Sequence, residues 1–170
     1  NLEKIANKGD PLKFKLPEPI INRAGCNLSF AGLKSAVLRQ SKKISKKRKD
    51  RYDLAASFQK TINNILLKKT KIAMSEFKKT ENIKNPTFVV AGGVAANKTI
   101  RTSLEKLCIK ENFNPLFPNI KYCGDNAAMI ALTGIKRFRN NLGSDVQITA
   151  KSRWPLDPGA PFMKGPGLKL

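Results

Sequence analysis

Histidine is absent from all 170 residues of this chain. Its absence excludes a Ser-His-Asp or Cys-His nucleophile and any zinc site that needs imidazole, unless another chain supplies the ring. Acidic residues are also few, with Asp+Glu 12 against Lys+Arg 33, so the formal net charge is +21. A charge of this size attracts polyanions such as nucleic acid, although an A+T-rich genome would enrich lysine without any selection for binding.

Cysteines and long apolar runs are scarce as well. Cys26, Cys108 and Cys123 show no C-x-x-C spacing, which argues against a disulfide framework or a cysteine-only zinc site and fits a reducing compartment. No apolar run of about 18 residues and no leader pattern is visible, so we expect a cytoplasmic protein without a membrane span. Because the sequence opens on Asn1 and directly on a helical pattern, we expect it to be a fragment.

Hydrophobic periodicity predicts alternating helices and strands, which is typical of an α/β fold. The predicted helices cover residues 1–8, 32–40, 53–79, 97–109 and 127–140, and the predicted strands cover 12–16, 87–91 and 114–117. The 53–79 helix carries an apolar stripe, with Asp53 near its start and lysines along the opposite face. We expect a folded region over residues 1–150, with a basic connection at 41–51, and an extended, proline-rich tail at 151–170.

Within the connection at 41–51, one short stretch concentrates positive charge. Its candidate nucleic-acid-binding residues are Lys42, Lys43, Lys46, Lys47, Arg48 and Lys49. Such a cluster can neutralise the phosphates of a nucleic acid backbone. The alternative is a solvated loop with no partner.

The first candidate site for chemistry is the loop Val89-Val90-Ala91-Gly92-Gly93-Val94-Ala95-Ala96-Asn97. A strand, paired glycines and a helix start place backbone N–H groups where a phosphate or an adenosine could approach without a Cβ in the way. Asn97 adds an amide that both donates and accepts hydrogen bonds. The alternative is a plain turn in which Asn97 caps the following helix.

The second candidate site is Cys123-Gly124-Asp125-Asn126-Ala127-Ala128-Met129. Asp125 follows a glycine at a predicted helix start, and the small alanines beside it leave room for a ligand. Its carboxylate could bind a divalent cation. The alternative is that Asp125 is the helix N-cap.

These two loops, together with Cys26-Asn27-Leu28-Ser29-Phe30-Ala31-Gly32-Leu33-Lys34 and Arg153-Trp154-Pro155-Leu156-Asp157, resemble the tRNA N6-adenosine threonylcarbamoyltransferase (TsaD) family. The blocks stand in the order that the family has and cover essentially the whole chain. Departures are modest: Asn27 stands where Asp is usual, Ala31 where Ser is common, and Lys151-Ser152 where Arg-Pro is usual. They put the neighbouring loop contacts in doubt, and not the resemblance.

The resemblance implies an actin-like ATPase (ASKHA, RNase H-like) fold, of which this chain is the C-terminal lobe only. The family transfers a threonylcarbamoyl group from threonylcarbamoyl-AMP to the N6 amine of the adenosine that follows the anticodon in tRNAs reading ANN codons, an acyltransferase reaction. By resemblance, Gly92, Gly93 and Asn97 lie at the substrate, and Asp125 binds a divalent metal, iron in preference to zinc. Two histidines outside this chain would complete the metal site, which accounts for the missing histidine.

By resemblance, the partners are tRNA, threonylcarbamoyl-AMP and the proteins TsaB and TsaE, with no membrane involved. We expect the chain to be inactive alone, because one carboxylate cannot hold a catalytic metal tightly. No residue stands out as a general base. Two alternatives remain: an actin-like small-molecule kinase or carbamoyltransferase, and a non-enzymatic RNA-binding or assembly module.

Overall fold

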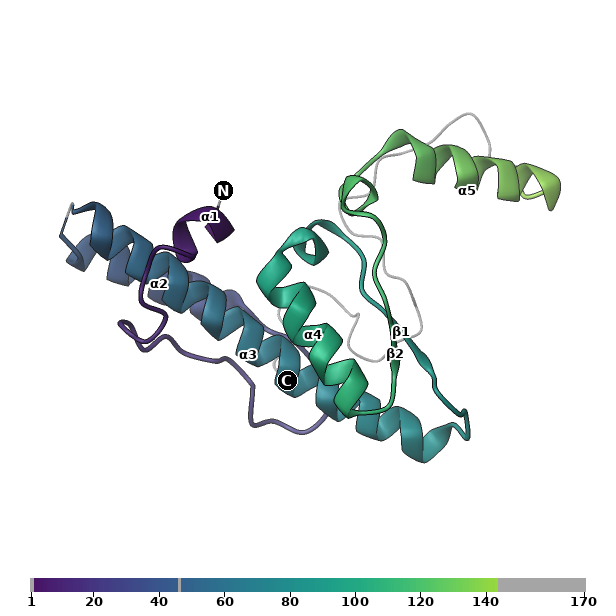
Figure 1. Cartoon of the computed structure of the whole chain (residues 1–170). Helices are drawn as coiled ribbons and strands as arrows, with labels where there is room; N and C mark the ends of the chain where they lie inside the picture. The colour runs from purple at the N-terminus through teal and green to yellow at the C-terminus, as the bar shows by residue number, and fades with distance from the viewer. Residues whose placement is uncertain (1, 46, 144–170) are drawn as a thin grey trace. The chain divides into compact units, whose positions relative to one another are not determined.

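The computed structural model in Figure 1 describes residues 2–45 and 47–143 of the chain. The chain divides into two units, residues 1–126 and 127–170, and each is described by itself. The elements of the first unit are α1 (Leu2–Ala6), α2 (Ala31–Lys43), α3 (Arg48–Thr80), β1 (Thr87–Val89), the 3-10 helix η1 (Gly93–Ala96), α4 (Lys98–Lys110), β2 (Asn114–Leu116) and the 3-10 helix η2 (Ile120–Tyr122). Helices and a small parallel sheet therefore make up a mixed α/β unit, in agreement with the predicted class.

The long helix α3 packs against the other three α-helices of the first unit, α1, α2 and α4. It has 33 residues, so it is about 50 Å long at the rise of an α-helix. It begins five residues before the predicted start, and α2 ends three residues after its predicted end. The predicted basic connection at 41–51 is therefore mostly helical, and the link between the two helices is only residues 44–47.

A row of buried polar side chains on α3 holds the segment that precedes α2. Asp53, Ser57 and Thr61 are spaced by four residues and lie on one face of the helix. The Asp10 backbone N–H donates to Asp53 Oδ1 at 2.8 Å, and the Phe14 N–H donates to Ser57 Oγ at 3.1 Å. Because these N–H groups bind helix side chains instead of a neighbouring strand, the predicted strand at 12–16 is wrong.

Lys69 corrects the prediction that the lysines of α3 lie on its exposed face. Its residue is only 2% exposed, and its Nζ donates to the carbonyl oxygens of Arg23 at 2.7 Å and Gly25 at 3.0 Å. Two carbonyl acceptors satisfy a buried ammonium group that would otherwise be costly. Lys69 thus holds the loop before α2 against α3.

The segment from β1 to β2 forms a parallel β-α-β unit with α4 as the crossover. Phe88 of β1 pairs in register with Pro115 of β2. Figure 1 shows α4 beside α3, and Met74 of α3 packs with Cys108 and Phe113 in the core between them. The strands predicted at 87–91 and 114–117 are confirmed, although β1 and β2 are each only three residues long. Thr87 and Val89 of β1 are exposed, while Phe88 between them is partly buried against the core.

The end of α4 shows why its predicted boundary was accurate. Asn112 takes the left-handed conformation with φ 56°. The Phe113 N–H then donates to the Cys108 carbonyl at 2.8 Å, which completes a Schellman-type C-cap and turns the chain into β2. Asparagine is the residue other than glycine that adopts this conformation most readily.

The second unit contains α5 (Ala127–Arg139), which confirms the helix predicted at 127–140. Its large apolar side chains are exposed, up to 83% at Phe138. The predicted tail at 151–170, including the Arg153-Trp154-Pro155 segment, lies outside the described residues. Among the helices of residues 2–45 and 47–143, none has the length and apolar character needed to cross a bilayer.

Candidate functional site

The loop that follows β1 exposes the backbone of two glycines. Gly92 has φ 91°, a conformation that side chains disfavour, and Gly93 opens the 3-10 helix η1. Apart from each glycine and its two chain neighbours, no described residue has an atom within 4 Å of the position that a Cβ would take at Gly92 or Gly93. A ligand could therefore approach the backbone closely here, as the sequence predicts for a substrate loop.

Asn97 ends this loop and is the N-cap of α4. Its Oδ1 accepts a hydrogen bond from the Ile100 N–H at 3.0 Å, and its Nδ2 donates to Gln59 Oε1 at 2.8 Å. The alternative that Asn97 caps the helix is thus confirmed. The amide has two N–H groups and two acceptor positions, so these bonds leave one of each for a substrate. Its substrate role stays a prediction.

Gln59 is a site residue that the sequence analysis missed. It is 7% exposed, and its Nε2 donates to Thr99 Oγ1 at 3.3 Å while its Oε1 accepts from Asn97. These two bonds fix which way the Asn97 amide points. The available signal was a polar residue between the apolar positions of the 53–79 helix, and such a residue needs partners when buried.

Asp125 lies after η2 in the second predicted loop and is exposed. Helix α5 begins at Ala127, so the position before the helix falls on Asn126, and the interpretation of Asp125 as its N-cap is wrong. Asn126 Nδ2 donates to the Gly124 carbonyl at 3.0 Å and to the Tyr122 carbonyl at 3.4 Å. Asp125 is therefore exposed on a turn that the Asn126 side chain closes.

The described residues do not form a metal site by themselves. No group of three or more His, Cys, Asp or Glu side chains comes together in residues 2–45 and 47–143. An exposed carboxylate such as that of Asp125 is a suitable oxygen ligand for a divalent cation. The described residues therefore fit a site to which Asp125 would supply one ligand and residues outside them would supply the others.

Residues 118–123, which lead to Asp125, lie beside the glycine loop (residues 89–97) at the same end of α4. Arg101, on the first turn of α4, donates to the Ala95 carbonyl of the glycine loop at 3.2 Å. It also donates to the Pro118 carbonyl, at the start of the segment that leads to Asp125, at 3.1 Å. The side chain of one residue thus bonds to the backbone of both segments, which are 28 residues apart between Asn97 and Asp125.

The predicted nucleic-acid-binding residues gather at the corner between α2 and α3. Lys42 and Lys43 end α2, while Lys47, Arg48 and Lys49 stand at the start of α3, and all five are exposed. Lys49 has a structural partner, since its Nζ lies 3.1 Å from Asp53 Oδ2. Lys46 lies outside the described residues. The nucleic-acid role of this corner stays a prediction.

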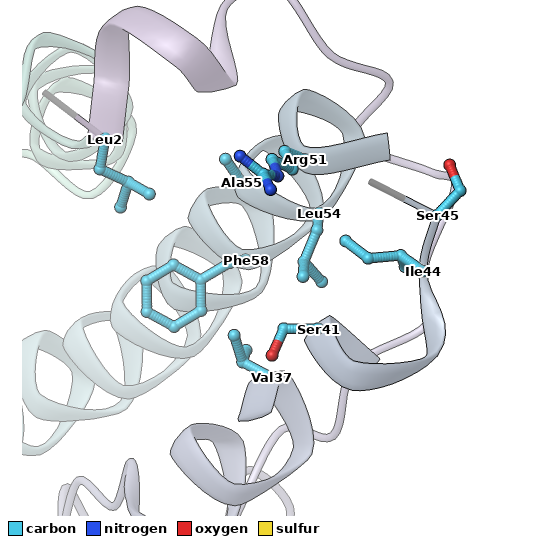
Figure 2. Close-up of a pocket in the computed structure, with 9 residues that line it drawn as sticks. All are labelled: Leu2, Val37, Ser41, Ile44, Ser45, Arg51, Leu54, Ala55 and Phe58. Atoms are coloured by element: carbon cyan, nitrogen blue, oxygen red, sulfur yellow. The ribbon is translucent and has the colours of Figure 1, made fainter. Parts of the chain in front are cut away.

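An apolar groove of about 500 Å³ opens beside this corner, between α1, α2 and α3. Figure 2 shows Phe58, Leu54, Val37 and Ile44 directed into it. None of the predicted substrate or metal residues lines it. The groove is therefore separate from the two loops that carry the predicted chemistry.

Two of the three cysteines have a raised thiol pKa. Burial raises the pKa of Cys26, and a hydrogen bond to Glu76 raises it further. Burial also raises the pKa of Cys108. A raised pKa disfavours the thiolate, which is the reactive form of cysteine.

Comparisons with known proteins identify the family of this chain. The family model described as "TsaD: tRNA N6-adenosine threonylcarbamoyltransferase" matches residues 1–132. A protein of that name from Pelagibacter ubique is 57% identical over 169 residues, covering 99% of this chain and 47% of the relative. Proteins of the same name from Ruegeria pomeroyi and Rhodospirillum rubrum are 41% and 39% identical, covering 99% and 98% of this chain and 47% and 46% of the relatives.

The chain spans about half the length of the curated relatives it matches. The family model nevertheless includes both predicted loops, since Asn97 and Asp125 fall within residues 1–132. This chain belongs to the tRNA N6-adenosine threonylcarbamoyltransferase family.

Proposed function

We propose that this chain is the C-terminal part of an enzyme that transfers threonylcarbamoyl from threonylcarbamoyl-AMP to the N6 amine of the adenosine following the anticodon in tRNA. The observation that carries the proposal is the arrangement of the two loops at one end of α4, within a chain of this family. In the reaction, the amine nitrogen attacks the carbamoyl carbon, the bond from that carbon to the phosphate oxygen breaks, and AMP leaves. The nitrogen then loses one proton, which passes to solvent.

Within this enzyme we propose separate roles for the two loops. The exposed backbone at Gly92 and Gly93 and the remaining hydrogen-bonding capacity of Asn97 suit them to hold the donor against the attacking amine. The adenine amine is a poor nucleophile, so positioning should supply much of the acceleration. Asp125 contributes one ligand to a divalent metal, iron in preference to zinc, and histidines outside this chain contribute two more. When bound, such a metal polarises the donor.

For the complete protein we propose an actin-like ATPase fold in which this chain is one lobe. The small parallel β-α-β unit is compatible with a part of such a lobe. We further propose that the protein acts in the cytosol with TsaB and TsaE. The cationic corner between α2 and α3 suits the tRNA backbone, because each neutralised phosphate releases counterions.

The test is made in the full-length protein with Asp125→Ala, and with Glu81→Gln as a control at another exposed acidic residue. Metal content and transfer to tRNA are measured in both. We expect Asp125→Ala to lose bound metal and transfer activity together, while the control keeps both. Unchanged metal content and unchanged transfer in Asp125→Ala would contradict the proposal.

A further inference from the structure

We propose that Arg101 is a positioning residue that sets the distance between the glycine loop and the Asp125 loop. The inference rests on the function proposed above, because it assigns to that site a residue that acts through the backbone of the two loops. Arg101 lies on α4, one turn after the Asn97 cap. The cap residue Asn97 and Thr99 both bond to Gln59 of α3, so the start of α4 is held against α3. The Arg101 side chain therefore extends from a fixed part of α4.

The hydrogen bonds of Arg101 divide between the glycine loop and residues 118–123, the segment that leads into the Asp125 loop. Nε donates to the Ala95 carbonyl at 3.2 Å, and one terminal nitrogen donates to the Pro118 carbonyl at 3.1 Å. The same nitrogen lies 3.6 Å from Cys123 Sγ, which is two residues before Asp125. A planar guanidinium holds its donors in a fixed geometry, so fixing one carbonyl also restricts the position of the other.

Packing makes these contacts rigid. Ala95 is 2% exposed and Cys123 is 3% exposed, so each loop is anchored at a buried residue. The Cys123 thiol approaches the carbonyls of Pro118 and Asn119 at 3.8 and 3.7 Å, which closes its own loop. The Arg101 guanidinium carbon also lies 4.8 Å from the centre of the Phe117 ring, a cation–π contact that limits its motion.

A lysine at this position could not make the same arrangement. Its single ammonium group can bind one of the two carbonyls well, but it has no planar fork with which to fix both. The function needs both loops at once, because one carries the proposed donor contacts and the other the proposed metal ligand. Since a misplacement of 1 Å can cost about 100-fold in rate, loss of this clamp should act on the chemical step.

The experiment compares Arg101→Met and Arg101→Lys with Lys106→Met in the full-length protein. Lys106 is exposed on the same helix, so its substitution removes a cation from α4 without touching either loop. Hydrogen–deuterium exchange is measured in residues 92–96 and 118–124, and kcat and KM are measured for transfer to tRNA. We expect faster exchange in both segments and a fall in kcat of about tenfold or more for Arg101→Met, in line with misplaced reacting groups.

For Arg101→Lys we expect faster exchange in one segment and an intermediate kcat, and for Lys106→Met no change in either. If Arg101→Met does not fold, Arg101→Lys decides the question, because it keeps the charge and most of the packing. Unchanged exchange in both segments, or an unchanged kcat, overturns the inference. A wild-type protein that makes no modified tRNA overturns the proposed function instead, and the exchange result still tests the clamp.

Discussion

Replacing Asn97 separates its role in folding from its proposed role in binding the donor. In Asn97→Ala, α4 loses its N-cap, which costs about 1 kcal/mol. The largely buried Gln59 Oε1 also loses its donor, which costs about another 1 kcal/mol. In Asn97→Ser the hydroxyl can still accept from the Ile100 N–H. We therefore expect the free energy of unfolding to fall by about 2 kcal/mol for Ala and about 1 kcal/mol for Ser.

The KM for the donor should not follow the order of the stability losses, in which Asn97→Ala loses more than Asn97→Ser. If the Asn97 amide binds the donor, both substitutions remove that contact, and both raise the KM for the donor by about tenfold, which corresponds to 1.4 kcal/mol. Asn63→Ala is the matched control, because Asn63 makes a similar bond from α3 to Ser103 of α4. It should cost about 1 kcal/mol of stability and leave the donor KM unchanged. A Ser variant with the wild-type donor KM would refute the reasoning and leave Asn97 as a cap only. Denaturant unfolding of the full-length variants gives the free energy of unfolding, and transfer kinetics give the KM for the donor.

Three further predictions concern the first unit. Gly9→Ala should lower the denaturation midpoint strongly, because a Cβ there would lie 2.1 Å from the Tyr52 carbonyl oxygen, whereas Gly32→Ala meets its nearest atom at 3.4 Å and should not. The Asp10 N–H, and after it Lys49, lower the pKa of Asp53, so the stabilisation from this carboxylate is present above its unfolded-state pKa and is lost as pH falls through the folded one. The stability difference between wild type and Asp53→Asn should therefore shrink in acid, and a constant difference between neutral and acidic pH would show that the charge is not responsible. Charge reversal at the basic corner should weaken tRNA binding and flatten its salt dependence, and the same reversal elsewhere should do so less. The corner set is Lys42, Lys43, Lys47 and Arg48, with Lys49 kept because it pairs with Asp53, and the control set is Lys79, Lys84, Lys106 and Lys110.

Much of the helical structure could be predicted from local sequence, because caps and periodicity act over a few residues. Asn97 and Asn112 mark the two ends of α4, and both are residue types that favour those positions. The strand predicted at 12–16 failed for a tertiary reason. Its alternating pattern is compatible with a strand, but its Phe14 N–H binds Ser57 of α3, which is 43 residues away.

The residues of the candidate site also fall into two groups, those that a local pattern marks and those that only tertiary contacts reveal. The glycine pair and the acid after Gly124 are local patterns, so Gly92, Gly93, Asn97 and Asp125 could be singled out from the sequence. Gln59 and Arg101 could not, because their importance depends on carbonyl and amide groups brought near them by folding. A polar residue on a helix that packs against loops has no local signature that distinguishes it from a solvated one.

The most direct measurement is a structure of the full-length protein with its metal and a non-reactive analogue of threonylcarbamoyl-AMP. We predict that the analogue lies against the backbone of Gly92 and Gly93 with Asn97 in hydrogen-bonding contact. We also predict that an Asp125 carboxylate oxygen is one of the ligands of the metal. An analogue bound away from the glycine loop, or a metal whose ligands do not include Asp125, would contradict the account.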